Sequence, residues 1–180
     1  MTLLAAENHV LNAKDSFVLD FSDREHSNIQ WRITDDGVMG GLSKGYFEIS
    51  PHGILEFGGK LSLDNNGGFS SVRSSDVNLD LSEQAGIALR VKGDGRTYQF
   101  RLNTDARYWS YEVSFSAEFQ TQKNQWLDIR IPFENFRAGF RGRSLNDVKL
   151  DPSKVRRIGI LLGDKKPGPF LLKIDSISSY

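Results

Sequence analysis

The stretch IALRVKGDGRTYQFRL, residues 87–102, alternates apolar and polar side chains on both sides of a Gly-Asp-Gly sequence. This period of two is typical of β-strands that bury one face. An Asp-Gly link supplies the positive φ that a tight turn requires, so residues 93–95 are predicted to join the two strands as a hairpin. The apolar positions are Ile87, Leu89, Val91, Tyr98, Phe100 and Leu102.

The same alternation recurs along the chain, with Gly, Pro and Asp residues between the runs, and helical periodicity is scarce. About nine or ten short strands separated by turn signals are typical of a sandwich or barrel. We therefore predict an all-β fold, a two-sheet antiparallel jelly-roll sandwich. The alternation in residues 109–115 places Trp109 and Tyr111 on the core side with Val113 and Phe115. The other runs are residues 17–21, 47–49, 55–63, 127–133, 158–162 and 170–174.

Length and composition limit the classes of function. The 180 residues fit one domain, and we expect residues 1–15 to form a flexible N-terminal lead and residues 16–180 a single jelly-roll domain. Lys plus Arg equals Asp plus Glu at 23 each, which argues against a nucleic-acid partner, and the chain has no cysteine for disulfides or thiol chemistry. No apolar run approaches a membrane span and no signal peptide is evident, so we expect a cytoplasmic location, free or peripheral to the inner membrane.

The polar positions of the alternating strands predict a binding surface. Gln99, Arg101 and Asn103 point outward from one strand, and Trp126 points outward from another. Planar polar groups and an aromatic ring can stack on and hydrogen-bond to sugars, or contact another protein. Arg73 can bind a carboxylate or a sugar hydroxyl with its forked donors. An ordinary solvated sheet surface is the alternative for each of these residues.

The segment DDGVMGGLS, residues 35–43, predicts an unusual backbone. A phosphate cradle needs a following helix, but the next residues alternate like a strand, so we reject that interpretation. Asp35 and Asp36 could provide carboxylate ligands for calcium. A structural turn is the alternative, and we favour it. We keep Asp36 as a candidate binding residue and expect no metal site. The glycines predicted to shape the backbone are Gly37, Gly40, Gly41, Gly67, Gly68, Gly93 and Gly95.

Catalytic motifs find little support in the sequence. The chain has three histidines, and it has neither a GxSxG nucleophile elbow nor HExxH zinc spacing. Paired carboxylates for glycoside cleavage stay open, because a sequence does not give the distance between them. We expect a protein that is not an enzyme and uses no cofactor.

Five motifs together carry a resemblance to a known family: WRITDDGVMGGLS, NNGGFSSVRS, KGDGRTYQFRL, QWLDIRIPFENF and RRIGILLGDKKPGPFLLKIDSI. In this order they resemble the complex I intermediate-associated protein family. Because no basic presequence is evident, the chain resembles a stand-alone prokaryotic member of that family. The resemblance implies a galactose-binding-like jelly roll and a non-catalytic assembly factor or chaperone. It implies a protein partner, with respiratory complex I subunits or intermediates as the candidates. The alternative is a carbohydrate-binding module that binds a glycan on an outward sheet face.

Overall fold

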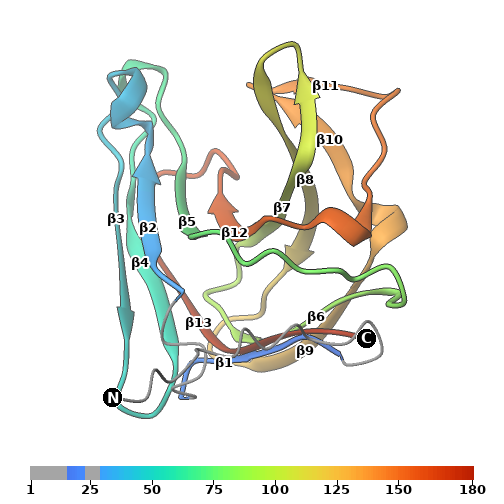
Figure 1. Cartoon of the computed structure of the whole chain (residues 1–180). Helices are drawn as coiled ribbons and strands as arrows, with labels where there is room; N and C mark the ends of the chain where they lie inside the picture. The colour runs from blue at the N-terminus through green and yellow to red at the C-terminus, as the bar shows by residue number, and fades with distance from the viewer. Residues whose placement is uncertain (1–15, 23–28) are drawn as a thin grey trace, which may run out of the picture.

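The computed structural model describes residues 16–22 and 29–180, and the predicted N-terminal lead, residues 1–15, lies outside this part. The described chain consists of β-strands joined by loops and short 3-10 turns, which confirms the all-β prediction (Figure 1). The strands are β1 Val18–Asp20, β2 Trp31–Asp35, β3 Lys44–Ile49, β4 Leu55–Leu61, β5 Ser70–Ser74, β6 Gly86–Lys92, β7 Thr97–Tyr108, β8 Tyr111–Gln120, β9 Trp126–Pro132, β10 Arg137–Phe140, β11 Arg143–Ser144, β12 Arg157–Leu162 and β13 Gly168–Ser179. The 3-10 turns are η2 Asp36–Met39, η3 Asp64–Asn66, η4 Phe133–Asn135 and η5 Pro152–Lys154.

Two antiparallel sheets form the sandwich, as predicted. The six-stranded sheet has the order β3-β4-β13-β6-β9, and β1 pairs with β13 beside this path. The seven-stranded sheet has the order β11-β10-β8-β7-β12-β5-β2. Pro132 ends β9, which is an edge strand. Proline has no N–H to donate to a neighbouring strand, and an edge strand tolerates this.

The core lies between the sheets and consists of the inward positions of the alternating strands. Phe57, Phe100 and Phe115 are fully buried, and the aliphatic side chains of β6 and β12 pack with them. Each fully buried apolar side chain of this size contributes about 1.5–3 kcal/mol to the free energy of unfolding. On β7 this burial turns the opposite face, with Gln99, Arg101 and Asn103, outward.

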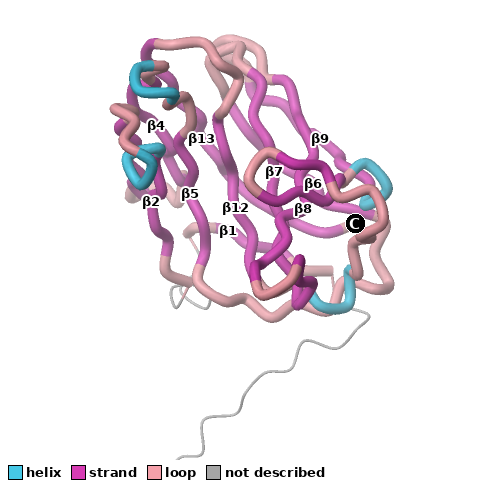
Figure 2. The backbone as a smooth tube through the Cα atoms, turned by 90° about the horizontal axis from the view of Figure 1, so that it is seen from above, coloured by secondary structure: helices cyan, strands magenta, loops and turns pink. Residues whose placement is uncertain are grey.

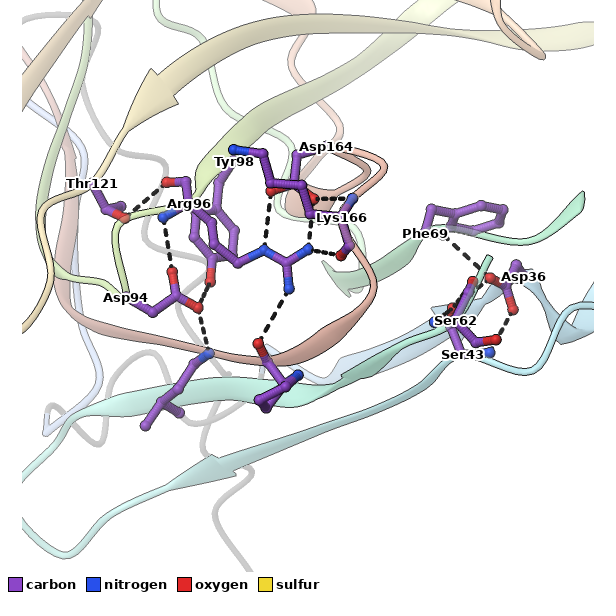
Figure 3. Close-up of polar contacts among 12 residues, drawn as sticks. Asp36, Ser43, Ser62, Phe69, Asp94, Arg96, Tyr98, Thr121, Asp164 and Lys166 are labelled. Atoms are coloured by element: carbon purple, nitrogen blue, oxygen red, sulfur yellow. Dashed lines mark hydrogen bonds and ion pairs between the residues drawn. The ribbon is translucent and has the colours of Figure 1, made fainter. Parts of the chain in front are cut away.

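The predicted hairpin at Gly93–Gly95 is wrong, because β6 belongs to the six-stranded sheet and β7 to the seven-stranded sheet. The turn is a crossover between the two layers. The carboxylate of Asp94 holds it: Oδ2 accepts from Leu171 N at 2.9 Å and from the Tyr98 hydroxyl at 3.0 Å (Figure 3). These bonds tie the start of β7 to β13 of the opposite sheet, which replaces the cross-strand bonds of a hairpin.

The prediction that Trp109 and Tyr111 face the core is also wrong. Trp109 occupies the turn between β7 and β8, where its side chain is 84% exposed, and Tyr111 is 48% exposed. β8 begins only at Tyr111, and Val113 is its first buried residue, so Trp109 and Tyr111 lie at the tip of the hairpin, beyond the part of the strand that covers the core.

Candidate functional site

Four of the six predicted binding residues lie on the outer face of the seven-stranded sheet. Gln99, Arg101 and Asn103 come from β7, and Arg73 comes from β5, with β12 between the two strands. The sheet curves so that β2 and β5 stand on one side of β12 and β7 and β8 on the other, with the outer face on the inside of the curve (Figures 1 and 2). The structure thus brings these four residues together.

A row of aligned residues crosses this face. Arg32 on β2 pairs with Arg73, Arg73 with Gly159 on β12, and Gly159 with Arg101. Because directly paired residues point to the same side of a sheet, the arginine side chains share one face. A Cβ at Gly159 would lie 3.2 Å from Cγ of Arg73, so the missing side chain leaves room for the Arg73 stem. We call Arg73, Arg101, Gln99 and Asn103 the arginine face.

The two central arginines are poorly compensated. Arg101 donates from Nη2 to Gln99 Oε1 at 3.2 Å, but its Nε is buried without a hydrogen-bond partner in the described part of the chain. Burial and the charge of Arg73 together lower the pKa of Arg101 to about 10. Burial also lowers the pKa of Arg73, with a further contribution from Arg157 that Glu112 partly offsets. Both guanidinium groups therefore carry a charge that the folded chain disfavours.

The neighbouring arginines on the same sheet are paired. Glu112 on β8 forms ion pairs with two arginines. Its Oε1 lies 3.2 Å from Nη1 of Arg107 and also contacts Nη2 of Arg157. Nε of Arg157 lies 3.2 Å from Asp76 Oδ1 as an ion pair, although, like Nε of Arg101, it is buried without a hydrogen bond among the described residues. Asn103 donates from Nδ2 to the Val113 carbonyl at 3.0 Å. Arg107 and Arg157 thus have carboxylate partners within the chain, while Arg73 and Arg101 have none among the described residues.

Trp126 does not join the arginine face. It begins β9 at the edge of the six-stranded sheet, where it is 38% exposed and pairs with Lys92 across the ladder. The guanidinium of Arg90 lies 5.7 Å from its ring, a cation–π contact. The outward direction was predicted correctly, but the residue belongs to the other layer.

Asp36 also lies apart from the face, and it is 1% exposed. Its carboxylate accepts from Ser43 N at 2.9 Å, Ser43 Oγ at 2.5 Å and Phe69 N at 3.2 Å (Figure 3). It also accepts from Gly68 N at 2.6 Å. Burial opposes the charged form, but these hydrogen bonds outweigh it and hold the pKa of Asp36 below its usual value. The carboxylate joins η2, the start of β3 and the start of β5.

The motif glycines make room for Asp36. A Cβ at Gly41 would lie 2.3 Å from its carboxyl carbon, and a Cβ at Gly67 would lie 2.6 Å from its Oδ2. Gly40 and Gly68 have φ of +87° and +119°. The two glycine-rich motifs are thus halves of one arrangement around a buried acid.

The carboxylates of Asp35 and Asp36, weighed above as a calcium site, both accept hydrogen bonds from the chain. Asp35 accepts from Gly45 N at 2.9 Å and from Ser70 Oγ at 2.6 Å, and so faces different partners from Asp36. Within residues 16–22 and 29–180, no group of three His, Cys, Asp or Glu side chains lies close enough to bind a metal ion.

An exposed cluster at the β7–β8 turn was not predicted from the sequence. The rings of Tyr108 and Trp109 stack with centroids 5.6 Å apart, and those of Tyr111 and Phe140 stack at 5.0 Å. The guanidinium of Arg141 lies over both Tyr111 and Phe140, at 5.5 and 5.4 Å. We call these five residues the hairpin-tip cluster. The only signal for it was the aromatic density of YWSY, residues 108–111, near the FRGR of residues 140–143.

A cavity of about 540 Å³ opens between η4, β10 and the segment 144–150. Phe133, Phe136 and Leu145 supply much of its apolar lining, and Glu134 and Lys149 lie on its wall. It is separate from both surfaces described above.

Comparison with known proteins identifies related sequences. A family model described as complex I intermediate-associated protein 30 (CIA30) matches residues 19–174. The chain is 27% identical over 183 residues to a Mus musculus protein named complex I intermediate-associated protein 30, mitochondrial, covering 91% of this chain and 55% of the relative. A Drosophila melanogaster protein of the same name is 25% identical over 170 residues, covering 82% of this chain and 57% of the relative. The chain thus spans a little over half the length of these relatives.

Two solved structures with the same fold are carbohydrate-binding modules. A family 11 module from Clostridium thermocellum in complex with a β-1,3-1,4-mixed-linked tetrasaccharide matches with a TM-score of 0.65, covering 91% of this chain and 94% of that one, at 18% identity. The family 11 module of the cellulase Lic26A-Cel5E matches with the same score at 16% identity. At this identity the likeness supports the β-sandwich fold alone.

The names of the relatives correct one prediction. We expected a cytoplasmic protein, free or peripheral to the inner membrane, but the Mus musculus and Drosophila melanogaster relatives are named as mitochondrial proteins. In the part of the chain that the structure describes, no helix is long and apolar enough to cross a membrane.

Proposed function

The chain belongs to the complex I intermediate-associated protein 30 family, and from this membership we propose that it is a non-catalytic module that binds a protein partner during assembly of respiratory complex I. Residues 16–180 act as one domain in this proposal. The C-terminal strand β13 supports that part, because it pairs with β1, β4 and β6 and so joins the first and last described strands in one sheet.

The observation that carries the proposal is the hairpin-tip cluster. Trp, Tyr and Arg are the residues most enriched among those that dominate binding energy at protein interfaces. A Trp side chain that is 84% exposed leaves a large apolar area in water, and covering it with a partner is favourable. The stacked rings and Arg141 hold the cluster in a fixed arrangement, which reduces the entropy lost on binding.

A capture experiment tests the proposal. The full chain carries an affinity tag in cells that make it naturally, and proteins cross-linked to it are identified by mass spectrometry. We expect complex I subunits, and we expect Trp109→Ser to reduce their recovery at least tenfold. Trp126→Ser is the matched control, since it removes an exposed tryptophan from the other sheet. Normal complex I content in cells that lack the chain would contradict the assembly role.

Carbohydrate binding is the second candidate. The planar polar groups of Gln99, Arg101 and Asn103 on the inside of a curved sheet favour it, because such groups hydrogen-bond sugar hydroxyls. An array of neutral glycans tests it. A signal that Arg101→Gln abolishes and Trp109→Ser preserves would support glycan binding over the protein-binding proposal, and background signal on all neutral glycans would remove this candidate.

A further inference from the structure

Arg73 and Arg101 form a pair of like charges across β12. Both are in register with Gly159, from opposite sides, so their side chains leave the same face of the sheet with no side chain between them. The Arg73 stem passes beside the space that a Cβ of Gly159 would fill. Two cations placed this close destabilise the folded chain unless an anion lies near both.

The same face shows how the chain compensates such a pair elsewhere. Glu112 lies between Arg107 and Arg157, so one carboxylate serves two guanidinium groups. Arg73 and Arg101 have no ion pair within the described residues, and Nε of Arg101 is shielded from water without an acceptor. Glu118, the acid aligned with Gln99 on β8, makes no ion pair with either of them in that part of the chain. A buried donor without an acceptor is uncommon and calls for a ligand or another explanation.

We propose that Arg73 and Arg101 bind a carboxylate that a ligand brings from outside the chain. Each planar guanidinium can donate two parallel hydrogen bonds to a carboxylate, a geometry that a lysine cannot match. The amide of Gln99 stands beside Arg101 and orients its guanidinium through the 3.2 Å bond. The site is distinct from the hairpin-tip cluster at the end of β7 and does not depend on the protein-binding function proposed above.

The unliganded pair has a measurable consequence. The burial and repulsion that lower the pKa of Arg101 also reduce the stability of the unliganded chain, because removing an uncompensated charge relieves the cost of burying it. Arg101→Gln is therefore expected to melt at a higher temperature than the original chain while losing the ligand. If Arg101 served only to stabilise the fold, Arg101→Gln would instead lower the melting temperature.

Succinate is the probe for the test, and inorganic phosphate and chloride at equal ionic strength are its comparisons. Calorimetric titration of the full chain is expected to show saturable binding of succinate and weaker binding of phosphate. We expect Arg73→Gln and Arg101→Gln each to weaken succinate binding at least tenfold, and Arg101→Lys to weaken it while keeping the original melting temperature. Arg130→Gln, which removes an arginine packed on Tyr180 in the six-stranded sheet, is the control that keeps binding.

Three results would overturn the site. One is a response to succinate no larger than the response to chloride. Another is equal succinate binding by Arg101→Gln and the original chain. Phosphate binding as tight as succinate would overturn the assignment to a carboxylate. The higher melting temperature expected for Arg101→Gln ensures that lost binding is not confused with unfolding.

Discussion

Nη2 of Arg96 lies 2.6 Å from Oδ1 of Asp164, and Nε of Arg96 lies 3.0 Å from Oδ2, in a two-bond pair whose side chains are about nine-tenths buried (Figure 3). Arg96 also donates to the carbonyls of Lys166 and Pro169, and so joins the start of β7 to the loop before β13 and to the start of β13 itself. Burial opposes the charged form of Asp164, but the hydrogen bonds from Arg96 outweigh it and keep its pKa below the usual value. The pair fixes the crossover between the two sheets.

Arg96→Met is therefore expected to lower the free energy of unfolding by about 3–5 kcal/mol, because Asp164 would remain buried without its partner. Urea denaturation monitored by tryptophan fluorescence measures this. The double variant with Asp164→Leu is expected to recover part of the loss. Arg90→Met is the control, since its pair with Asp128 is exposed and should contribute less than about 1 kcal/mol. Equal losses for Arg96→Met and Arg90→Met would show that the crossover does not need the buried pair.

The stability of the chain is expected to fall in acid because of Asp36. Its pKa is lower in the folded chain than the usual 3.8, so the charged form stabilises the fold above that value. The contribution is lost as pH falls through the lower, folded pKa. Asp36→Asn should cost about 2 kcal/mol at pH 7 and should flatten the dependence of stability on pH below 4.

Urea denaturation at a series of pH values from 7 to 3 tests this second prediction. Asp64→Asn is the matched control, because Asp64 is an exposed acid in η3 beside the same glycine-rich turn. We expect that control to keep the acid dependence of the original chain. An Asp36→Asn chain that loses stability in acid as steeply as the original would place the responsible carboxylates elsewhere.

The glycines around Asp36 are expected to differ in their tolerance of a side chain. Gly68→Val combines a φ of +119° with a Cβ 2.8 Å from Leu63, and Gly41→Ala would place a Cβ 2.3 Å from the Asp36 carboxyl. Each should lose about 2 kcal/mol or more of stability. Gly37→Ala should be nearly neutral, because its Cβ would meet nothing within 4 Å. Thermal unfolding compares the three, and a Gly37→Ala chain as unstable as the other two would reject the close-contact explanation.

The sequence predicted which face of each strand is buried better than it predicted which strands lie side by side. Alternation correctly placed Phe100 inside and Arg101 outside, because burial of one face sets the period. Alternation does not say which sheet a strand joins, so Trp126 and Arg101 were assigned to one surface although they lie on different layers. The Asp-Gly turn was misassigned for the same reason, since local turn chemistry suits a crossover as well as a hairpin.

The site was predictable in part. Arg73 was a candidate from its guanidinium alone, but its position beside Arg101 depends on β12, which arrives from far along the chain between β5 and β7. The pairing of Glu112 with two arginines depends on the same long-range register. The hairpin-tip cluster was missed because Trp109 lies in the turn between β7 and β8, where the alternation of a strand does not apply.

Trp109 is expected to reduce the stability of its own turn. It has a φ of +56°, a left-handed conformation that favours glycine and strains a bulky residue by about 1–3 kcal/mol. Trp109→Gly removes this strain but loses the stacking on Tyr108 and gives the unfolded chain more freedom. The net expectation is a gain of about 0.5 kcal/mol in the free energy of unfolding, measured by urea denaturation.

The comparison with partner binding decides what this strain means. If the hairpin-tip cluster binds a protein, Trp109→Gly should abolish capture of the partner while the chain is at least as stable as before. Asn124→Gly is the control, because it relieves a similar φ of +59° in a loop on another part of the chain and should leave capture unchanged. A Trp109→Gly chain that is destabilised by 1 kcal/mol or more and still captures the partner would assign the exposed ring to the turn itself. Because a strained tryptophan persists only where surrounding structure or function requires it, the two measurements together separate those causes.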